Sequence, residues 1–179
     1  KYLIMISSDN LQLRALEPED IDLLYEWEND TSVWHLSNTL TPFSRFALEQ
    51  YVLNAGNDLF TDKQLRLMID LLAGEEKRCI GCVDLFDFDP VHTRAGIGIM
   101  IISEERGKGY ASEALDLVID YAFNTLNLHQ LYSNVIANNK ASLELFKKKH
   151  FAVIGVKKEW LRRKDSWADE YMLQKINKQ

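Results

Sequence analysis

The sequence predicts one α/β domain built on a mixed central sheet. Segments that alternate apolar and polar residues, typical of strands, are interspersed with segments of helical spacing, in the order β-α-α-β-β-β-α-β-α-β-β. Three consecutive strands indicate an antiparallel meander, and a strand-helix-strand-helix segment follows it. The 179 residues fit a single domain, residues 1–179, which can build a core without a metal or disulfides.

The first third of the chain predicts one strand and two helices. Residues 10–16, NLQLRAL, alternate as a half-buried strand does. Pro18 suits the first turn of a helix, and acidic residues surround it where a helix N-terminus is positive. A second apolar stripe at helical spacing follows Ser44. The polar residues 57–63 then interrupt the pattern.

The remaining two thirds predict six strands and two helices. The meander strands are residues 64–72, 78–86 and 94–102. A helix with an apolar face from Ala111 to Leu126 follows a glycine-rich turn. The chain then predicts a strand at 131–137, a helix at 138–150, and two closing strands at 151–161 and 166–176.

Charge and composition exclude several classes of partner. The net charge of −6 and the pI of about 5.2 argue against a general nucleic-acid binder and suit a cationic partner slightly better. No apolar run approaches the roughly 18 residues of a membrane span. The opening KYLIMI is too short for the apolar centre of a signal peptide. We therefore expect a cytoplasmic protein with no membrane partner.

The two cysteines, Cys79 and Cys82, form a C-x-x-C spacing that raises the question of zinc or redox chemistry. The surrounding segment predicts a strand, on which residues three apart point to opposite faces. No second cysteine or histidine pair completes a zinc site. We expect two buried, reduced thiols and no metal.

The turn RGKGYA predicts an anion site. It stands between an apolar strand and an amphipathic helix, whose first N–H groups lack partners and carry partial positive charge. Gly107 and Gly109 allow phosphates to approach the backbone closely, and Arg106 and Lys108 add charge. The turn matches neither the Walker A pattern nor the dinucleotide fingerprint. A tight turn with solvated charges is the alternative.

Two motifs carry a family resemblance. RGKGYA fits R/Q-x-x-G-x-G/A, with Arg106, Gly109 and Ala111 at the fixed positions, which resembles the acetyl-CoA pyrophosphate loop of the GNAT superfamily of N-acetyltransferases. The pattern N-x-x-S-x-x-L-Y-x-K-x-G-F of that family is matched by Asn139, Ser142, Leu145, Lys148 and Phe151. The resemblance implies a GNAT-like acyl-CoA N-acyltransferase fold, splayed at the cofactor strand, with acetyl-CoA as cosubstrate.

The resemblance also implies which residues hold the cosubstrate. Backbone amides at the pyrophosphate belong to Gly107, Gly109, Tyr110 and Ala111, with the charges of Arg106 and Lys108 beside them. The strand that splays and pairs with the pantetheine arm contains Ile99, Met100 and Ile101. Asn139 and Lys148 are expected along the cofactor.

Within the superfamily the chain most resembles the spermidine/diamine acetyltransferases and the neighbouring ribosomal-protein N-terminal acetyltransferases. This implies transfer of an acetyl group to a primary amine, which a carboxylate can attract and deprotonate. Asp84 matches an acidic position of the polyamine branch and is our candidate for that base. Glu26 and Glu28, with Asp84, are candidates for holding a cationic substrate, although a solvated helix face also explains the two glutamates.

One position departs from the family pattern. Phe146 stands where most members have a tyrosine that protonates the departing thiolate, and a phenyl ring cannot donate a proton. Water, Tyr132 or Ser142 remain as substitutes for the tyrosine as the proton donor.

Three functions therefore stay open: a polyamine acetyltransferase, an acetyltransferase of protein N-termini or other small amines, and a non-catalytic acyl-CoA-binding module. The resemblance also implies a homo-oligomer, a dimer or larger.

Overall fold

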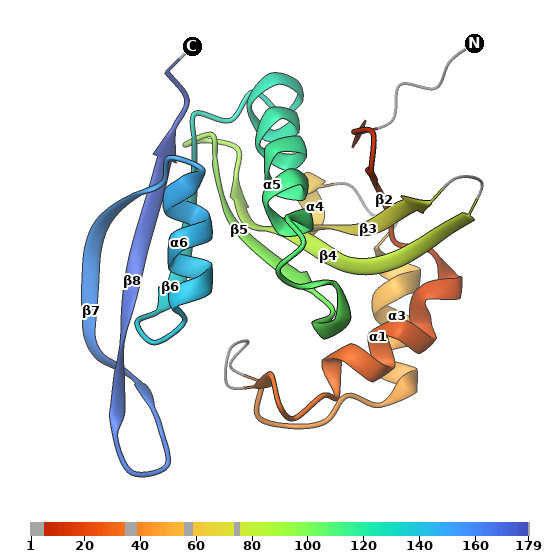
Figure 1. Cartoon of the computed structure of the whole chain (residues 1–179), viewed down its shortest axis with the longest axis horizontal. Coiled ribbons are helices and arrows are strands. Elements are labelled where there is room, and N and C mark those ends of the chain that lie inside the picture. The colour runs from red at the N-terminus through yellow and green to blue at the C-terminus, as the bar shows by residue number, and fades with distance from the viewer. Residues whose placement is uncertain (1–5, 35–38, 56–58, 74–75, 179) are drawn as a thin grey trace.

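The computed structural model describes residues 6–34, 39–55, 59–73 and 76–178, and it shows an eight-stranded mixed sheet (Figure 1). The strand order across the sheet is β1-β2-β3-β4-β5-β6-β8-β7. The strands are β1 (Ile6–Ser7), β2 (Leu11–Ala15), β3 (Leu65–Ala73), β4 (Glu76–Asp89), β5 (Arg94–Ile101), β6 (Gln130–Ile136), β7 (Ala152–Arg162) and β8 (Trp167–Ile176). The helices are α1 (Ile21–Glu28), α3 (Arg45–Asn54), α4 (Leu59–Asp62), α5 (Tyr110–Asp120) and α6 (Lys140–Lys148). This confirms the predicted mixed α/β fold. The predicted elements occur in the expected order, with two additions: the short strand β1, and the four-residue helix α4 within residues 57–63, which were expected to interrupt the pattern.

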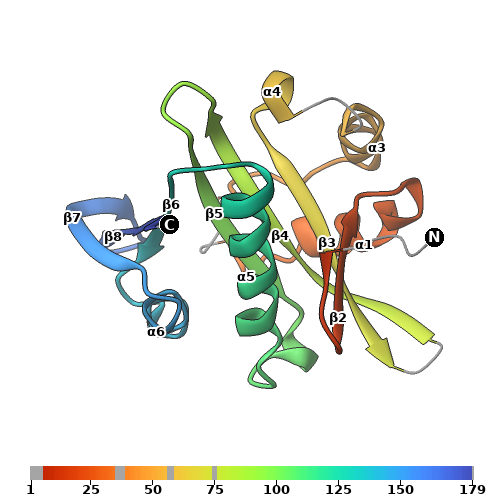
Figure 2. The ribbon, with the colours of Figure 1, turned by 90° about the horizontal axis from the view of Figure 1, so that it is seen from above.

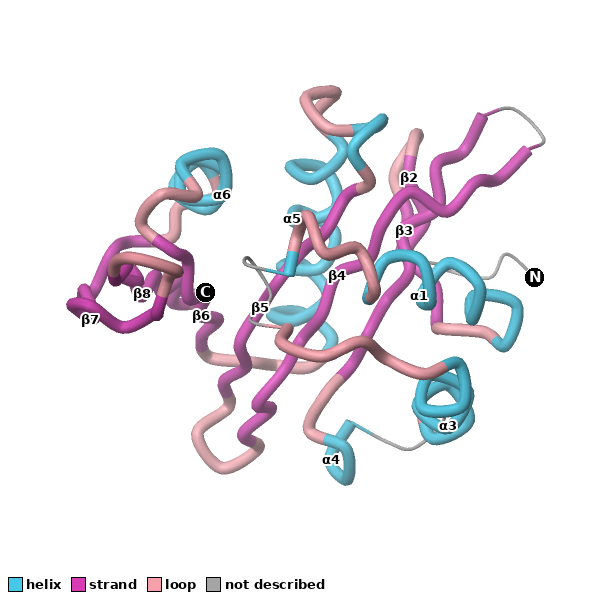
Figure 3. Tube along the Cα trace, turned by 90° about the horizontal axis from the view of Figure 1, so that it is seen from below, coloured by secondary structure: helices cyan, strands magenta, loops and turns pink. Residues whose placement is uncertain are grey.

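Helices cover the sheet from both sides. Figure 2 shows α3 and α4 on one side and α5 and α6 on the other, and Figure 3, seen from below, again shows α3 and α4 on the side of the strands opposite α5. The larger apolar core lies between the sheet and α5, where Leu115 and Val118 are fully buried against Ile97. A smaller core lies under α1 and α3, around Leu24 and Met68. We call the side covered by α1 and α3 the acceptor face.

A β-bulge in the β3–β4 hairpin corrects one sequence expectation. Asp70 pairs with Cys79, but Ile69 pairs with Gly81, so Ile80 is an extra residue on β4. The extra residue turns Cys79 and Cys82 to the same face, where both contact the smaller core; the prediction that they point to opposite faces is wrong. Both are free thiols, and burial raises the pKa of Cys79 to about 11 and that of Cys82 to about 12. They are therefore protonated near neutral pH.

Strands β5 and β6 pair only at one end. Their parallel pairing joins Arg94 to Gln130 and ends with Gly96 opposite Tyr132. Beyond Gly96, no pairing between the two strands occurs in the described residues, and Figure 1 shows them diverging. The sheet is thus splayed at β5, as the resemblance implies. Its C-terminal part, β6-β8-β7 with α6, stands apart from the rest beyond this point (Figure 2).

Within the described residues, no helix combines the length and the apolar character that crossing a membrane requires.

Candidate active site

The glycine turn presents open backbone at the N-terminus of α5. Gly107 and Gly109 have φ angles of 77° and 93°, in the left-handed region that favours glycine. A Cβ built on either residue would meet no atom within 4 Å, so the space beside the turn is open. Gly109 is the N-cap of the eleven-residue helix α5, and the first amides of that helix lack intrahelical partners. This geometry fits a bound phosphate group.

The basic side chains of the turn are directed at protein atoms. The Nε of Arg106 donates to the carbonyl oxygen of Ile101 at 2.8 Å. The Nζ of Lys108 donates to Oε2 of the buried Glu105 at 2.9 Å, and Arg78 binds the other oxygen of that carboxylate. Hydrogen bonds from Lys108 and Arg78 lower the pKa of Glu105. In this structure, therefore, each of the two basic side chains is anchored to the protein by one hydrogen bond, and the open backbone of the turn lies beside them.

The splayed strand β5 directs alternate backbone groups into the gap. Ile102 donates its N–H to Ile80 on β4 at 2.9 Å. Because backbone direction alternates along a strand, Met100 also faces β4, whereas Ile99 and Ile101 face the gap toward β6. Of the predicted cofactor residues on this strand, Ile99 and Ile101 can pair through their backbone, and Met100 can contribute only its side chain.

The residues of the second motif occupy three kinds of position on helix α6: the N-cap, the side that faces the core, and the exposed surface. Asn139 is its N-cap, and Oδ1 of Asn139 accepts from the backbone N of Ser142 at 3.2 Å. Phe146 is 2% exposed and packs edge-on against Phe151, with ring centroids 5.1 Å apart. Phe146 is thus a core residue, and Lys148 is exposed to solvent.

Tyr132, one substitute acid considered above, lies at the last pairing between β5 and β6. Its hydroxyl donates to Oδ2 of Asp87 at 3.1 Å, and its ring packs edge-on against Phe86. Burial, together with that hydrogen bond, raises the pKa of Tyr132 to about 12. A thiol has a pKa near 8.5, so proton transfer from Tyr132 to a thiolate would be uphill.

Two predicted acids meet on the acceptor face through an arginine. Nε of Arg66 donates to Oδ1 of Asp84 at 2.7 Å and NH2 donates to Oδ2 at 2.8 Å, while NH1 donates to Oε1 of Glu28 at 2.7 Å. Only 15% of the Arg66 side chain is exposed, against 26% for Glu28 and 22% for Asp84. Although burial alone lowers the pKa of Arg66, the hydrogen bonds to Asp84 raise it above its ordinary value. The three groups together carry one net negative charge.

Glu26 does not join this group. Residues two apart on a helix differ by about 200° around the axis, so Glu26 and Glu28 point in nearly opposite directions. Glu28 turns toward β3, and Glu26 is exposed on the other side of α1. The structure therefore brings together two of the three predicted substrate acids, and it adds Arg66, which no sequence motif had marked.

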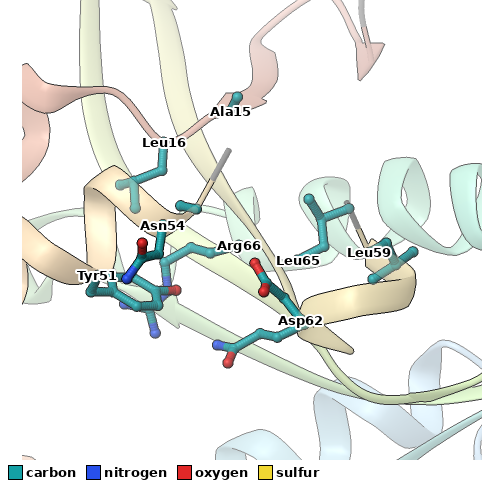
Figure 4. Close-up of a pocket in the computed structure, with 10 residues that line it drawn as sticks. Ala15, Leu16, Tyr51, Asn54, Leu59, Asp62, Leu65 and Arg66 are labelled. Carbon is teal, nitrogen blue, oxygen red and sulfur yellow. The ribbon is translucent and has the colours of Figure 1, made fainter. Parts of the chain in front are cut away.

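A pocket of 280 Å³ lies on the β2 side of Arg66 (Figure 4). Tyr51 and Asn54 of α3 line one side of it and Asp62 of α4 another, with apolar contributions from Leu16 and Leu65. The Arg66 guanidinium carbon lies 5.7 Å from the centre of the Tyr51 ring. Since the lining includes no residue of β4 or β5, this pocket is separate from the gap between β5 and β6. Among the described residues, no cluster of three histidine, cysteine, aspartate or glutamate side chains could hold a metal ion.

Comparison with known proteins identifies the class. The acetyltransferase (GNAT) domain model matches residues 10–152, so the chain belongs to the GNAT acetyltransferase family. It is an N-acetyltransferase that takes its acetyl group from acetyl-CoA, as the sequence predicts. This membership favours an enzyme over the non-catalytic acyl-CoA module.

Several relatives are acetyltransferases. The chain is 32% identical over 158 residues to spermidine N(1)-acetyltransferase of Escherichia coli K12, covering 84% of this chain and 77% of that protein. It is 29% identical over 172 residues to the uncharacterized N-acetyltransferase p20 of Bacillus licheniformis, covering 96% of each.

Solved structures agree on the fold. Spermidine N-acetyltransferase from Vibrio cholerae, in complex with CoA and spermine, matches with a TM-score of 0.85 at 24% identity, over 94% of this chain and 96% of that one. A dodecameric structure of the same enzyme matches with a TM-score of 0.77 at 25% identity, over 94% and 95% of the two chains.

Proposed function

We propose that this protein acetylates a primary amine of a polyamine or diamine such as spermidine. The observation that carries the proposal is the pair of partly exposed carboxylates, Glu28 and Asp84, on the acceptor face beside the cofactor strand. Asp84 pairs directly with Gly98 of β5. A net negative group at this point attracts an ammonium ion. The spermidine acetyltransferases among the relatives support the same substrate class.

The proposed binding of acetyl-CoA rests on the splayed strand β5 and the glycine turn. The amides of Gly107, Gly109, Tyr110 and Ala111 would bind the pyrophosphate, and the backbones of Ile99 and Ile101 would pair with the pantetheine arm. Lys108 and Arg106 can add their charges to the phosphates if they leave Glu105 and the Ile101 carbonyl. Asn139 and Lys148, at the two ends of α6, would add contacts along the cofactor, with the Asn139 oxygen already engaged in capping.

The chemistry requires a neutral amine. An alkylammonium ion with a pKa near 10.4 is neutral only about once in 2,500 at pH 7, which costs about 4.6 kcal/mol. Asp84 would accept the proton, directly or through water, as the nitrogen forms a bond to the acetyl carbon and the C–S bond breaks. The sulfur departs as a thiolate and takes a proton from water, since Phe146 is buried in the core and has none to give.

A panel of acceptors tests the substrate class. Thiol release from acetyl-CoA is measured with spermidine, spermine, putrescine and peptides with free N-termini. We expect the highest kcat/KM with a polyamine or diamine. Turnover restricted to the peptides would contradict the polyamine proposal and support acetylation of protein N-termini instead.

Gly109→Asp tests the cofactor site. The substitution strains the left-handed turn and adds a negative charge where the pyrophosphate would bind, so CoA affinity measured by calorimetry should fall at least 100-fold, about 2.7 kcal/mol. Gly155→Asp, on β7, is a control in open space that should leave CoA affinity unchanged. Equal affinity of Gly109→Asp and the parent would remove the turn from the proposal.

Two further proposals concern assembly and location. Strand β7 is an edge strand with exposed apolar side chains, among them Val153, Ile154 and Trp160, which favours association of copies of this chain. Sedimentation velocity would measure the resulting dimer or larger homo-oligomer. The free thiols Cys79 and Cys82 are consistent with the reducing cytoplasm as the location of the protein.

A further inference from the structure

We infer that Arg66 is a positioning residue of the acceptor site, which holds the Asp84 carboxylate in a fixed orientation beside the cofactor strand and offsets the negative charges of Asp84 and Glu28. This inference rests on the proposed amine acetylation for its effect on catalysis. Its effect on the charge of Asp84 is independent of which substrate the enzyme takes.

The geometry fixes the Asp84 carboxylate from one side. Arg66 and Asp84 are directly paired across β3 and β4, and two parallel N–H···O bonds of 2.7 and 2.8 Å join the guanidinium to both carboxylate oxygens. Such a bidentate pair fixes the plane of the carboxylate as well as its distance. A single ammonium group in place of the guanidinium could not supply both bonds in this geometry.

The opposite side of Asp84 opens toward the cofactor strand. Asp84 pairs with Gly98 of β5, two residues beyond the end of the pairing with β6. A Cβ at Gly98 would have only the ring of Phe86 nearby, at 3.8 Å. Because Gly98 has no side chain, nothing from that residue separates the acceptor face beside Asp84 from the cofactor strand.

The charged and titratable groups around Asp84 explain why a cation is needed there. Glu28 faces it from α1, Tyr51 from α3 and Cys82 from its own strand. Burial raises the pKa of Tyr51 and of Cys82, so both are neutral near pH 7. Arg66 is therefore the cation that offsets two neighbouring carboxylates. Without it, like-charge repulsion would favour protonation of one of them.

The chain contains a matched control, Arg14. Its guanidinium also binds two carboxylates, with NH1 and NH2 donating to Asp20 at 2.7 and 2.8 Å and Nε donating to Asp70 at 2.7 Å. It lies on β2, which pairs with β1 and β3 and not with the cofactor strand. Loss of Arg14 should therefore affect stability without changing the chemistry at Asp84.

The first experiment compares the pH dependence of Arg66→Met and Arg14→Met, with Arg14→Lys as a milder control if Arg14→Met folds poorly. With the best amine of the panel, we expect the loss of kcat/KM in Arg66→Met to be larger at pH 6 than at pH 9, because a carboxylate that has lost its cation is protonated more readily in acid. The Arg14 variants should show the parent's profile per folded molecule. A uniform loss across pH in Arg66→Met, or the same pH-dependent loss in the Arg14 variants, would overturn the inference.

The second experiment supplies the missing cation. Millimolar guanidinium should raise the kcat of Arg66→Ala at least tenfold, with a smaller change in KM. It should not change the activity of Arg14→Ala. If Arg66 acts through Asp84, the double variant Arg66→Ala/Asp84→Asn should be no worse than Asp84→Asn and should not be rescued. Rescue that persists in the double variant would assign Arg66 another role.

A third readout needs no substrate. The carboxyl carbon of Asp84, followed by nuclear magnetic resonance against pH, should titrate at higher pH in Arg66→Met than in the parent, because the substitution removes the cation that binds both of its oxygens. An unchanged midpoint would refute the effect on charge. If the parent acetylates no amine of the panel, the proposed function fails while this titration still decides the role of Arg66.

Discussion

Two arginines on the acceptor face each bind two carboxylates, yet the two clusters differ in what they leave accessible. In the Arg14 cluster the carboxylates are almost fully enclosed, with Asp20 and Asp70 side chains 4% and 7% exposed. In the Arg66 cluster the arginine is enclosed instead, and Glu28 and Asp84 remain 26% and 22% exposed. An enclosed acid is available only to its own arginine, whereas a partly exposed acid can also bind a substrate.

The Arg14 cluster joins three segments of the fold. Asp20 also accepts from the backbone N of Glu17 at 2.9 Å, which fixes the turn leading into α1, and Asp70 lies on β3 beside the bulge. One oxygen of Asp70, Oδ1, is buried without a hydrogen-bond partner. These features describe a structural connection between β2, β3 and the start of α1. The Arg66 cluster has the same chemistry but lies one strand nearer the cofactor.

The largest expected difference is between Asp84→Asn and Asp70→Asn. Asp84→Asn should lower kcat/KM for the best amine, measured per folded molecule, about 100- to 1,000-fold, the range of a lost general base. Asp70→Asn should cost about 3 kcal/mol of unfolding free energy because it breaks a buried ion pair, and the folded fraction should keep its kcat/KM. Steady-state kinetics and urea unfolding of both variants measure this. Equal kinetic losses in the two would abolish the distinction between the clusters.

The variant Asp20→Asn tests how much the Arg14 cluster contributes to stability as the pH falls. Burial by itself raises the pKa of Asp20, but the hydrogen bonds from Arg14 and from the backbone of Glu17 outweigh it and lower the pKa. A carboxyl with a lowered pKa stabilises the fold above its unfolded value of about 3.9, and this stabilisation is lost as the pH falls through the folded value. The parent should thus exceed Asp20→Asn by about 2 kcal/mol at pH 7, with the gap closing below about pH 4. Urea unfolding at a series of pH values gives this difference, and a gap that widens in acid would contradict it.

Local patterns predicted most of the fold, and the register of one hairpin explains most of what they missed. The glycine turn and the strands around it depend on residue type and short spacing, which the sequence displays. The pairing of Arg66 with Asp84 depends on the extra residue Ile80, since an unbroken register from Ala73 and Glu76 would pair Arg66 with Val83. The same bulge reversed the expected direction of Cys79. No periodicity in the sequence signals a single inserted residue.

Helical phase is the sequence signal that separates the two glutamates. Glu28 lies four residues after the buried Leu24 and therefore on the same face of α1, whereas Glu26 lies opposite. The expectation that both hold a cationic substrate overlooked this phase. The arginine that accompanies Glu28 comes from a strand 38 positions away, and only the tertiary pairing reveals it.

The smallest expected effect separates Glu28 from Glu26. Glu28→Gln removes one of the two charges facing the bound ammonium, and at an exposed fraction of 26% this should raise KM for the polyamine about tenfold, equivalent to about 1.4 kcal/mol. Glu26→Gln changes net charge by the same amount on the opposite side of α1 and should change KM less than twofold. Raising the salt concentration should shrink the effect of Glu26→Gln first, because exposed charges are screened most. Equal KM values for the two variants would mean that net charge, and not the Arg66 cluster, selects the substrate.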